Sequence, residues 1–429
     1  MRGVNRRTFL ASAGSGAAAL AIGSGVRAAG PNDQIKVAVI GIRSRGQSHI
    51  DAFTKHKDTA VVALCDVDSR LFNGSAKKVE DRSKSGKAPK LVTDLRRIMD
   101  DKDIDVVSIA TPNHWHALAA VWAIQAGKDV YVEKPVSHNV SEGRKIVDAA
   151  RKYDKIVQAG TQNRSSEGVI SAMDFLHSGK LGKVYLSKGL CYKPRGSIGT
   201  KADAPTPEGV NYDVWLGPAP ERPFNPNRFH YEWHWSWDYG NGDIGNQGIH
   251  QMDIARWGLN KNELPKHIVA SGGRYGYKDD GETPNTQVAA FKYDDCMLEF
   301  EVRGLPTNAE SGVKVGNLFY GTEGVLVLDE GRWSTYFGHK NEPGPKGQGG
   351  GDHFANFVDA VKSRKRESLK AEVLDGHLSS ALCHLGNIAY RLGRGLKLDP
   401  KTETFIGDKE ADAMLTREYR SPFSMPDKV

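Results

Sequence analysis

The sequence predicts an α/β protein that begins with a doubly wound parallel sheet and continues into a second domain containing antiparallel strands. Three observations support this prediction. Short β-branched runs alternate with helical patterns between residues 34 and 158, a glycine turn follows the first run, and later strand-like runs come in close pairs. Alternating strands and helices indicate a parallel sheet, whereas closely paired runs indicate hairpins.

Length and charge narrow the class of protein. The 429 residues suffice for two or three domains, and 39% hydrophobic residues with 26% charged residues is ordinary for a globular protein. The formal net charge is +7, but Arg2, Arg6, Arg7 and Arg27 lie in the first 29 residues, which contain no acid. The remainder is close to balanced, so composition gives no reason to expect a nucleic-acid partner.

Residues 1–29 have the pattern of a signal peptide. Arg6-Arg7 precedes an apolar stretch that is diluted by Gly and Ser, and Ala28-Ala29 supplies small residues for cleavage. The arginine pair resembles a twin-arginine signal, which predicts a periplasmic or otherwise exported protein. An uncleaved anchor and a chance arginine pair are the alternatives. No later segment approaches the roughly 18 apolar residues needed for a stable membrane span.

Export would place the four cysteines in an oxidising compartment. Their positions, Cys65, Cys191, Cys296 and Cys383, match no metal or redox motif. We therefore expect isolated buried thiols, with one distant disulfide as the alternative.

The first strand, turn and helix have the layout of a dinucleotide-binding unit. The run 35–40 ends on Gly41, Gly46 precedes a helical pattern, and a second run over 60–65 ends in Asp66, 20 residues after the last glycine. Glycines at such a turn let the backbone approach a pyrophosphate at the helix N-terminus, and the acid accepts hydrogen bonds from the ribose. This predicts a Rossmann domain over residues 34–158.

The cofactor prediction favours NAD over NADP. Asp66 would repel a 2′-phosphate. Arg43, which occupies the middle glycine position of the fingerprint, and Arg45 argue the other way, because either could pair with that phosphate or with the pyrophosphate.

Further strands over 105–110, 129–132 and 155–159 alternate with helices over 117–126 and 141–152, the second with Ser141 as its expected N-cap. Ligands of such sheets lie at the carboxyl ends of the strands. The predicted cofactor-binding residues there are Gly41, Arg43, Ser44, Arg45, Gly46, Asp66, Thr111, Pro112, Asn113, His116, Glu133, Lys134 and Gln162.

The glycine turn and three motifs at these strand ends resemble the Gfo/Idh/MocA oxidoreductases: Ala-Thr-Pro-Asn-His at 110–114, Glu-Lys-Pro at 133–135 and Ala-Gly-Thr-Gln-Asn-Arg at 159–164. The segment 245–253 in the second domain resembles the same family. The resemblance covers nearly all of residues 34–429. It implies an α/β domain over 159–429 whose open, mostly antiparallel sheet carries substrate and subunit contacts. It also implies a homo-oligomer that oxidises or reduces a secondary alcohol of a sugar or cyclitol.

The resemblance also implies catalytic roles. Lys134 matches the lysine that bonds the reacting hydroxyl and moves its proton, and His250 matches the acid/base histidine of the second domain. Where the family usually has an aspartate, this chain has Asn246, which we expect to bind substrate and assist less with the proton. Asp253, one helical turn after His250, is the expected orienting partner. A surface lysine and a satisfied core histidine are the alternatives for Lys134 and His250.

The second domain contains an irregular arm and an aromatic segment. Prolines at 194, 205, 207, 218, 220, 223 and 226 predict an arm that is either a lid over the cleft or a contact to another subunit. Trp233, Trp235 and Trp237 share one side if the segment is extended, which suits a sugar ring, core packing or a subunit interface. The predicted substrate-binding residues are Asn163, Tyr192, Trp233, His234, Trp235, Tyr239, Asn246 and His250.

A metal site is the alternative for this segment, with His230, Glu232, His234 and Asp238 as potential ligands. Their spacing matches no zinc signature, so no metal is predicted.

The later part of the chain is expected to contain hairpins and two helices. Paired strands are predicted at 286–293 with 297–303 and at 318–322 with 325–329, a flexible loop at 341–351, and helices over 352–363 and 372–393.

Together these features predict an NAD(P)-dependent oxidoreductase that moves a hydride between nicotinamide and a ring CH–OH of a sugar, glycoside or cyclitol. Redox-neutral cleavage of a glycoside by oxidation, elimination, hydration and reduction is one alternative, and a non-catalytic nucleotide- or sugar-binding protein is another. Because an exported enzyme would meet little free NAD, we expect the cofactor to stay bound through successive cycles.

Overall fold

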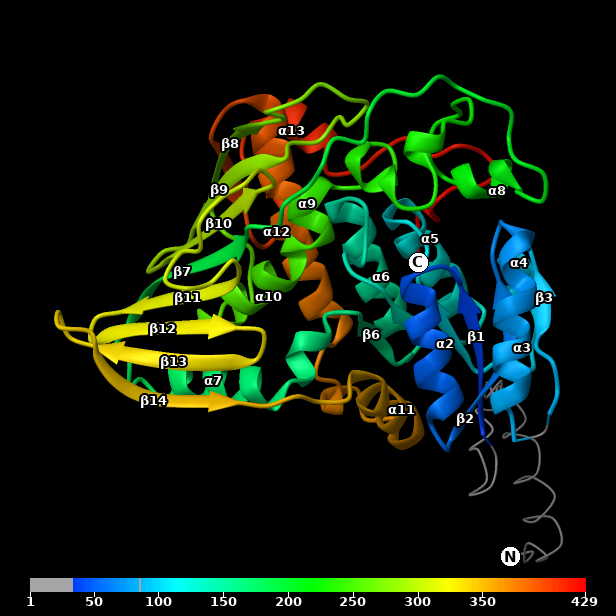
Figure 1. Cartoon of the computed structure of the whole chain (residues 1–429), viewed down its shortest axis with the longest axis horizontal. Coiled ribbons are helices and arrows are strands. Elements are labelled where there is room, and N and C mark those ends of the chain that lie inside the picture. The colour runs from blue at the N-terminus through cyan, green and yellow to red at the C-terminus, as the bar shows by residue number, and fades with distance from the viewer. Residues whose placement is uncertain (1–33, 85) are drawn as a thin grey trace, which may run out of the picture. The chain divides into compact units, whose positions relative to one another are not determined.

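The first part of the chain folds into a six-stranded sheet (Figure 1). The computed structural model describes residues 34–84 and 86–429, and the predicted signal peptide (residues 1–29) lies outside them. The strands lie in the order β3-β2-β1-β4-β5-β6 and are β1 (Ile35–Ile40), β2 (Thr59–Cys65), β3 (Lys90–Val92), β4 (Val106–Ile109), β5 (Asp129–Val132) and β6 (Val157–Ala159). Every neighbouring pair is parallel, which confirms the predicted doubly wound sheet.

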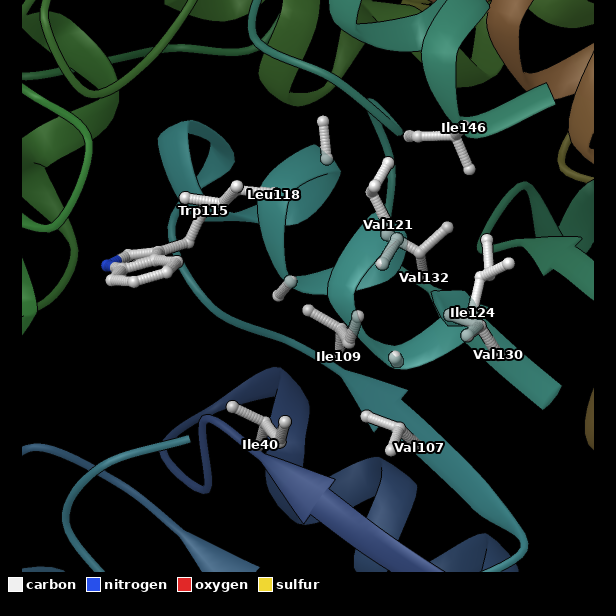
Figure 2. Close-up of a cluster of buried hydrophobic side chains, with 14 of the residues drawn as sticks. Ile40, Val107, Ile109, Trp115, Leu118, Val121, Ile124, Val130, Val132 and Ile146 are labelled. Atoms are coloured by element: carbon white, nitrogen blue, oxygen red, sulfur yellow. The ribbon is translucent and has the colours of Figure 1, made fainter. Parts of the chain in front are cut away.

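Helices cover both faces of this sheet: α2 (Arg45–Lys55), α3 (Phe72–Arg82), α4 (Arg96–Asp100), α5 (Asn113–Gln125) and α6 (Val140–Lys152). Figure 2 shows one of the two cores, in which Ile109 and Val132 from the strands meet Leu118 and Val121 from α5. Helix α5 is buried nearly all round, which explains why its sequence is apolar without a polar face. The opposite face is covered by α2 and by α11 (His353–Ser363), which returns from the C-terminal part of the chain.

The second part of the chain is built on a ten-stranded sheet with the order β14-β13-β12-β11-β7-β10-β9-β8-β15-β16. Its strands are β7 (Val184–Cys191), β8 (His267–Gly273), β9 (Thr286–Lys292), β10 (Met297–Arg303), β11 (Val315–Gly321), β12 (Gly324–Asp329), β13 (Arg332–Phe337), β14 (Glu342–Gln348), β15 (Leu396–Asp399) and β16 (Thr404–Phe405). The pair of β7 with β10 is parallel and the other pairs are antiparallel, so the mostly antiparallel sheet is confirmed.

Three helices pack on this sheet: α7 (Glu167–His177), α10 (Gly248–Gly258) and α12 (Val373–Leu392). The shorter helices are α8 (Tyr212–Leu216) in the proline-rich arm, α9 (Gly242–Asn246) directly before α10, and α13 (Lys409–Ala413). In the described part of the chain, none of the helices combines the length and apolarity required to cross a membrane.

Two local predictions were wrong. Residues 341–351 were expected to be a loop, but β14 occupies most of this segment and pairs with β13. As the last strand of the sheet it needs hydrogen-bond donors on one side only, so Pro343 and Pro345 are tolerated there. Helix α6 begins at Val140, and its N-cap is Asn139, whose side chain accepts a hydrogen bond from the Glu142 amide at 3.0 Å; Ser141 is already inside the helix.

A buried ion pair joins the loop after β6 to helix α10. Arg164 Nε lies 2.8 Å from Asp253 Oδ2, and the same carboxylate accepts a hydrogen bond from Ser379 Oγ of α12 at 2.6 Å. The expectation that Asp253 orients His250 was therefore wrong. Although the two residues are one turn apart, the carboxylate is committed to Arg164.

We expect Asp253→Ala to destabilise the fold by about 3–5 kcal/mol, because it leaves the buried Arg164 guanidinium with only the longer ion pair to Asp375, at 3.3 Å, and removes the hydrogen bond from Ser379. Denaturant unfolding monitored by tryptophan fluorescence measures this change. An unchanged unfolding free energy together with a reduced turnover number would contradict the structural assignment and restore the catalytic one.

The four cysteines are free thiols, and Cys65, Cys191 and Cys383 are buried. Burial raises the pKa of the partly exposed Cys296 to about 11, although Lys261 opposes the shift. At mildly alkaline pH, a thiol reagent should therefore react slowly with Cys296 alone in the native protein. In denaturant without reductant all four should react, and a smaller number would reveal a disulfide.

Candidate active site

A cavity of about 360 Å³ lies at the carboxyl ends of the parallel strands and is lined by residues from both parts of the chain. Of the predicted cofactor-binding residues, Gly46 is not among the lining residues. The others all line it: Gly41, Arg43, Ser44, Arg45, Asp66, Thr111, Pro112, Asn113, His116, Glu133, Lys134 and Gln162.

The turn between β1 and α2 has a backbone conformation that requires glycine at two positions, and we call it the glycine cradle. Gly41 has a φ of +80°, and a Cβ on Gly46 would lie 1.9 Å from the Gly41 carbonyl oxygen. The turn therefore stays close to the N-terminus of α2, where backbone amides favour a phosphate. Arg45 Nη2 and Thr111 Oγ1 line the cavity as buried polar atoms without a hydrogen-bond partner in the described chain, so a bound nucleotide has polar groups to satisfy.

Asp66 follows β2 directly and holds the same turn. Its carboxylate accepts hydrogen bonds from the Ile42 amide at 2.8 Å and from the Asp68 amide at 3.0 Å. Burial raises the pKa of Asp66, although these two amides oppose the shift. Asp66 thus stabilises the turn and also lines the cavity. Together, the residues of this part of the cavity fit a dinucleotide.

Lys134 lies two residues beyond the end of β5. Its Nζ donates a hydrogen bond to the backbone carbonyl of Asn246 at 2.7 Å, and it forms no ion pair with residues 34–84 or 86–429. Burial lowers the pKa of Lys134; Glu133 opposes this, whereas Arg45 and Lys193 lower the pKa further. A lysine in this environment can lose its proton and act as a base.

The carboxylate of the neighbouring Glu133 interacts with Arg45 and His49 and does not form an ion pair with Lys134 in the described part of the chain. Its Oε1 accepts from Arg45 Nε at 2.7 Å and lies 3.1 Å from His49 Nε2, while its Oε2 accepts from the Lys134 amide. Burial opposes ionisation, but Arg45 and His49 hold the pKa of Glu133 well below its usual range. Glu133 is thus an ionised support for the strand end that carries Lys134.

His250 projects from α10 into the same cavity. Burial, followed by the charge of Lys134, lowers the pKa of His250 to about 3, so its ring is neutral at neutral pH. Its Nδ1 is buried and has no hydrogen-bond partner in the described chain. A neutral imidazole can donate or accept a hydrogen bond, which suits a group that orients a reacting hydroxyl. Asn246 lines the cavity beside it.

The proline-rich arm folds over this cavity within the same chain. The Asn211 amide donates to the Val67 carbonyl at 2.8 Å, and the Ser69 amide donates to the Gly209 carbonyl at 2.9 Å. Together with the aromatic segment that follows it, the arm contributes seven lining residues: Arg195, Val214, Trp215, Phe229, His230, Tyr231 and Trp233. The arm therefore covers the cavity as a lid would, and the predicted contact to another subunit stays a prediction.

The aromatic segment is not extended. Residues Glu232–Trp235 form a short 3-10 helix, so the tryptophans do not share one face. Trp233 lines the cavity, whereas Trp235 is buried beneath the Arg274 guanidinium, 4.6 Å from its ring.

Three further predicted substrate residues, Tyr192, His234 and Tyr239, do not line the cavity. The Tyr192 hydroxyl donates to Glu301 at 2.6 Å, His234 Nδ1 lies 2.7 Å from the Tyr231 carbonyl, and Tyr239 packs on Trp215. Asn163 lines a second, adjoining cavity. Among residues 34–84 and 86–429 no three His, Cys, Asp or Glu side chains are grouped closely enough to hold a metal.

Sequence reasoning missed several residues that line the cavity. Lys193 and Arg195 follow the end of β7, and Gln247 sits between α9 and α10. The available signal was their position directly after a strand or beside the Asn246 motif. Trp215 and Tyr231 carried no local signal, because only the folding of the arm brings them to the cavity.

Comparisons with known proteins agree with this geometry. Residues 35–161 match the oxidoreductase family with an NAD-binding Rossmann fold, and residues 186–309 and 341–425 match the C-terminal alpha/beta domain of the same Gfo/Idh/MocA family. Two solved structures are similar. One is the WlbA dehydrogenase from Chromobacterium violaceum in complex with NADH and UDP-GlcNAcA (18% identity, TM-score 0.65, 86% of this chain and 97% of that one). The other is the aldose-aldose oxidoreductase from Caulobacter crescentus complexed with glycerol (17% identity, TM-score 0.63, 85% of this chain and 100% of that one).

Curated relatives match over a shorter span. A glycosyl hydrolase family 109 protein from Shewanella baltica is 28% identical and an alpha-N-acetylgalactosaminidase from Shewanella oneidensis is 27% identical, each over 177 residues. Each alignment covers 36% of this chain and 39% of the relative, so this chain spans well under half the length of the relatives it matches. The two family matches, by contrast, cover most of the sequence and agree with both sheets. The chain therefore belongs to the Gfo/Idh/MocA family of NAD-binding oxidoreductases.

Proposed function

We propose that this protein oxidises a secondary ring hydroxyl of a sugar, glycoside or cyclitol, with NAD as the hydride acceptor. One observation carries the proposal. A single cavity contains the glycine cradle, whose turn suits a dinucleotide, together with a lysine that has no ionic partner in the described part of the chain and a neutral histidine. Hydride removal from a carbinol carbon requires a base for the hydroxyl proton, and Lys134 is placed to be that base.

A bound NAD would supply the acceptor for the hydride of the carbinol carbon. Lys134 Nζ would take the hydroxyl proton, which leaves a ketone. The Asn246 carbonyl holds Nζ in place before and after it takes the proton. His250, neutral at neutral pH, hydrogen-bonds the same hydroxyl and fixes its orientation. The Asn246 amide hydrogen-bonds a neighbouring hydroxyl.

The residues around the adenosine position favour NAD over NADP. Asp66 faces the cavity after β2, where a negative charge disfavours a 2′-phosphate. Arg43 lies exposed at the rim, where it can contact the pyrophosphate or solvent.

Redox-neutral glycoside cleavage is a second candidate, favoured by the similarity to a glycosyl hydrolase family 109 protein and an alpha-N-acetylgalactosaminidase. Oxidation two carbons away from the anomeric carbon acidifies the ring C–H between them. Loss of that proton expels the aglycone from the anomeric carbon, water adds across the resulting double bond, and the hydride returns to the ketone carbon. The protons of these steps need a base and an acid, for which Lys134 and His250 are available.

The lid supports a cofactor that is not exchanged between cycles, so the hydride must pass to a second substrate or return to the same sugar before the next cycle. Arm residues line the cofactor cavity, and His230 Nε2 of the aromatic segment lies 3.3 Å from Asp68 Oδ2, beyond β2. Twin-arginine export carries folded proteins, so the chain would load its nucleotide before it reaches the periplasm. We include in this proposal a homo-oligomer formed through the large sheet, whose face exposes Tyr185, Val288 and Met297.

We expect Lys134→Met to lower the rate of sugar-dependent nicotinamide reduction by about 10²–10⁴-fold, since it removes the base. In the wild-type protein the rate should fall as the pH drops through the pKa of Lys134, which lies below the ordinary value, because protonation disables the base. The measurement is absorbance of reduced nicotinamide across a panel of sugars and glycosides.

The matched control is Lys128→Met. Lys128 is also a buried lysine whose Nζ donates only to backbone carbonyls, those of Asp101 and Ile104, but it lies outside the cavity. The Lys128→Met substitution should lower the free energy of unfolding and leave the pH dependence of nicotinamide reduction unchanged. Equal losses in both variants, or no absorbance change with any sugar while nucleotide binding persists, would favour a non-catalytic binding protein.

The purified protein should contain about one nicotinamide per chain that survives dialysis, because the lid closes over the cavity. Denaturation followed by an enzymatic NAD assay measures the content. His230→Ala, which removes the contact between lid and Asp68, should lose the nucleotide faster. Protein that purifies empty and binds NAD weakly would instead be an ordinary dehydrogenase with exchanging cofactor.

A further inference from the structure

A second cavity, of about 340 Å³, adjoins the first at His250. Gln162, Gln247 and His250 line both cavities, so the two spaces meet at these side chains. The remaining walls come from α7, α10, β11 and the end of β12. We call this space the polar chamber; its further lining residues are Asn163, Ser166, Val169, Gln251, Ile254, Val315, Gly316, Asn317, Leu328, Glu330 and Gly331.

Four buried polar atoms of the polar chamber have no hydrogen-bond partner in the described chain. They are Gln162 Oε1, His250 Nδ1, Gln251 Oε1 and Asn317 Oδ1. Gln251 is 5% exposed and Asn317 is 0% exposed, so bulk solvent does not satisfy them. Buried polar groups are nearly always hydrogen-bonded, and four orphans in one cavity indicate that something else supplies their partners.

The orientation of the Asn317 amide is fixed by the protein. Its Nδ2 donates to the Gln251 backbone carbonyl at 2.8 Å, which leaves Oδ1 to accept. The strand itself is held close at this point, because a Cβ on Gly316 would lie 2.3 Å from the Leu328 carbonyl oxygen. The acceptor is thus part of a rigid wall.

The polar groups that line the polar chamber indicate which kind of ligand it can bind. Three of the four orphan atoms are amide oxygens, which accept hydrogen bonds, so the ligand must donate. No lysine or arginine lines the polar chamber, and its one carboxylate, on Glu330, belongs to an exposed residue. A neutral ligand with several hydroxyl groups meets these conditions, whereas an anion does not. The volume would otherwise hold on the order of ten waters.

We propose that the polar chamber binds a second sugar unit of the substrate, beyond the ring that is oxidised. The inference rests on the proposed function, which puts the reacting hydroxyl between Lys134 and His250. A substrate that continues past Gln162 and Gln247 enters the polar chamber directly. The protein therefore prefers disaccharides or longer glycosides to single sugars, and Gln251 and Asn317 determine that preference.

The test compares disaccharides with methyl glycosides of the same sugar and linkage, by calorimetric titration of the NADH-loaded protein. The pairs are lactose with methyl β-galactoside, melibiose with methyl α-galactoside, cellobiose with methyl β-glucoside, and maltose with methyl α-glucoside. At least one disaccharide should bind about tenfold or more tightly than its methyl glycoside, since each added hydrogen bond to a buried acceptor contributes up to roughly tenfold in affinity.

Gln251→Leu should remove most of this preference by weakening disaccharide binding selectively. It should not lower the melting temperature, because it replaces an unsatisfied buried oxygen by an apolar group. The matched control is Ser187→Ala: Ser187 Oγ is also buried without a partner, but it lies in β7 outside the polar chamber. This variant should keep the preference intact.

Equal affinity within all four pairs, or an equal loss for both members of a pair in Gln251→Leu, would overturn the proposal. So would a crystal structure with NAD in which the nicotinamide carboxamide fills the polar chamber. The two proposals fail separately. Oxidation of methyl glycosides without disaccharide preference rejects the second sugar site alone, whereas disaccharide preference without nicotinamide reduction rejects the oxidoreductase function and leaves the site.

Discussion

The hydrogen bond from Lys134 Nζ to the Asn246 carbonyl is the contact on which the site depends. It joins the end of β5 in the parallel sheet to the end of α9, directly before the helix that carries His250. A carbonyl oxygen fixes the position of the amine without adding a formal negative charge. The lysine is thus held in place while its pKa stays lowered by burial, a combination that a carboxylate partner would not allow.

The carboxylates around the cavity are arranged so that none of them forms an ion pair with Lys134 in the described part of the chain, which is consistent with its lowered pKa. Asp66, which lines the cavity, accepts hydrogen bonds from two backbone amides. Three other carboxylates around the cavity are each paired with an arginine. The pairs are Glu133 with Arg45, Asp253 with Arg164, and Asp243 with Arg195. These pairs also connect distant segments. The interactions that keep the site geometry therefore also place an arginine beside Glu133 and Asp243, the two carboxylates whose charge raises the pKa of Lys134.

Local sequence signals predicted the parts of the structure that local interactions determine. The strands ending at Gly41 and Asp66 and the position of Lys134 after β5 follow from alternation and turn residues, and the structure has them where expected. Trp235 and Asp253 show the limit. From its spacing, Trp235 was expected to bind substrate, but it packs beneath Arg274. Asp253 was expected to orient His250, but it pairs with Arg164. Both partners lie far along the chain, so spacing alone does not reveal them.

Asn246 is where this chain departs from the aspartate that the family resemblance led us to expect. An aspartate there would place a carboxylate in the cavity that already holds Lys134, and their attraction would favour the protonated amine and raise its pKa. An amide keeps hydrogen-bonding capacity and removes that charge. The polar chamber continues the same trend, since amides of Gln162, Gln251 and Asn317 line it in place of charged groups. From the nicotinamide side to the far wall, the path proposed for the substrate is therefore polar but nearly neutral, which suits a hydroxyl-rich ligand and leaves the proton chemistry to Lys134.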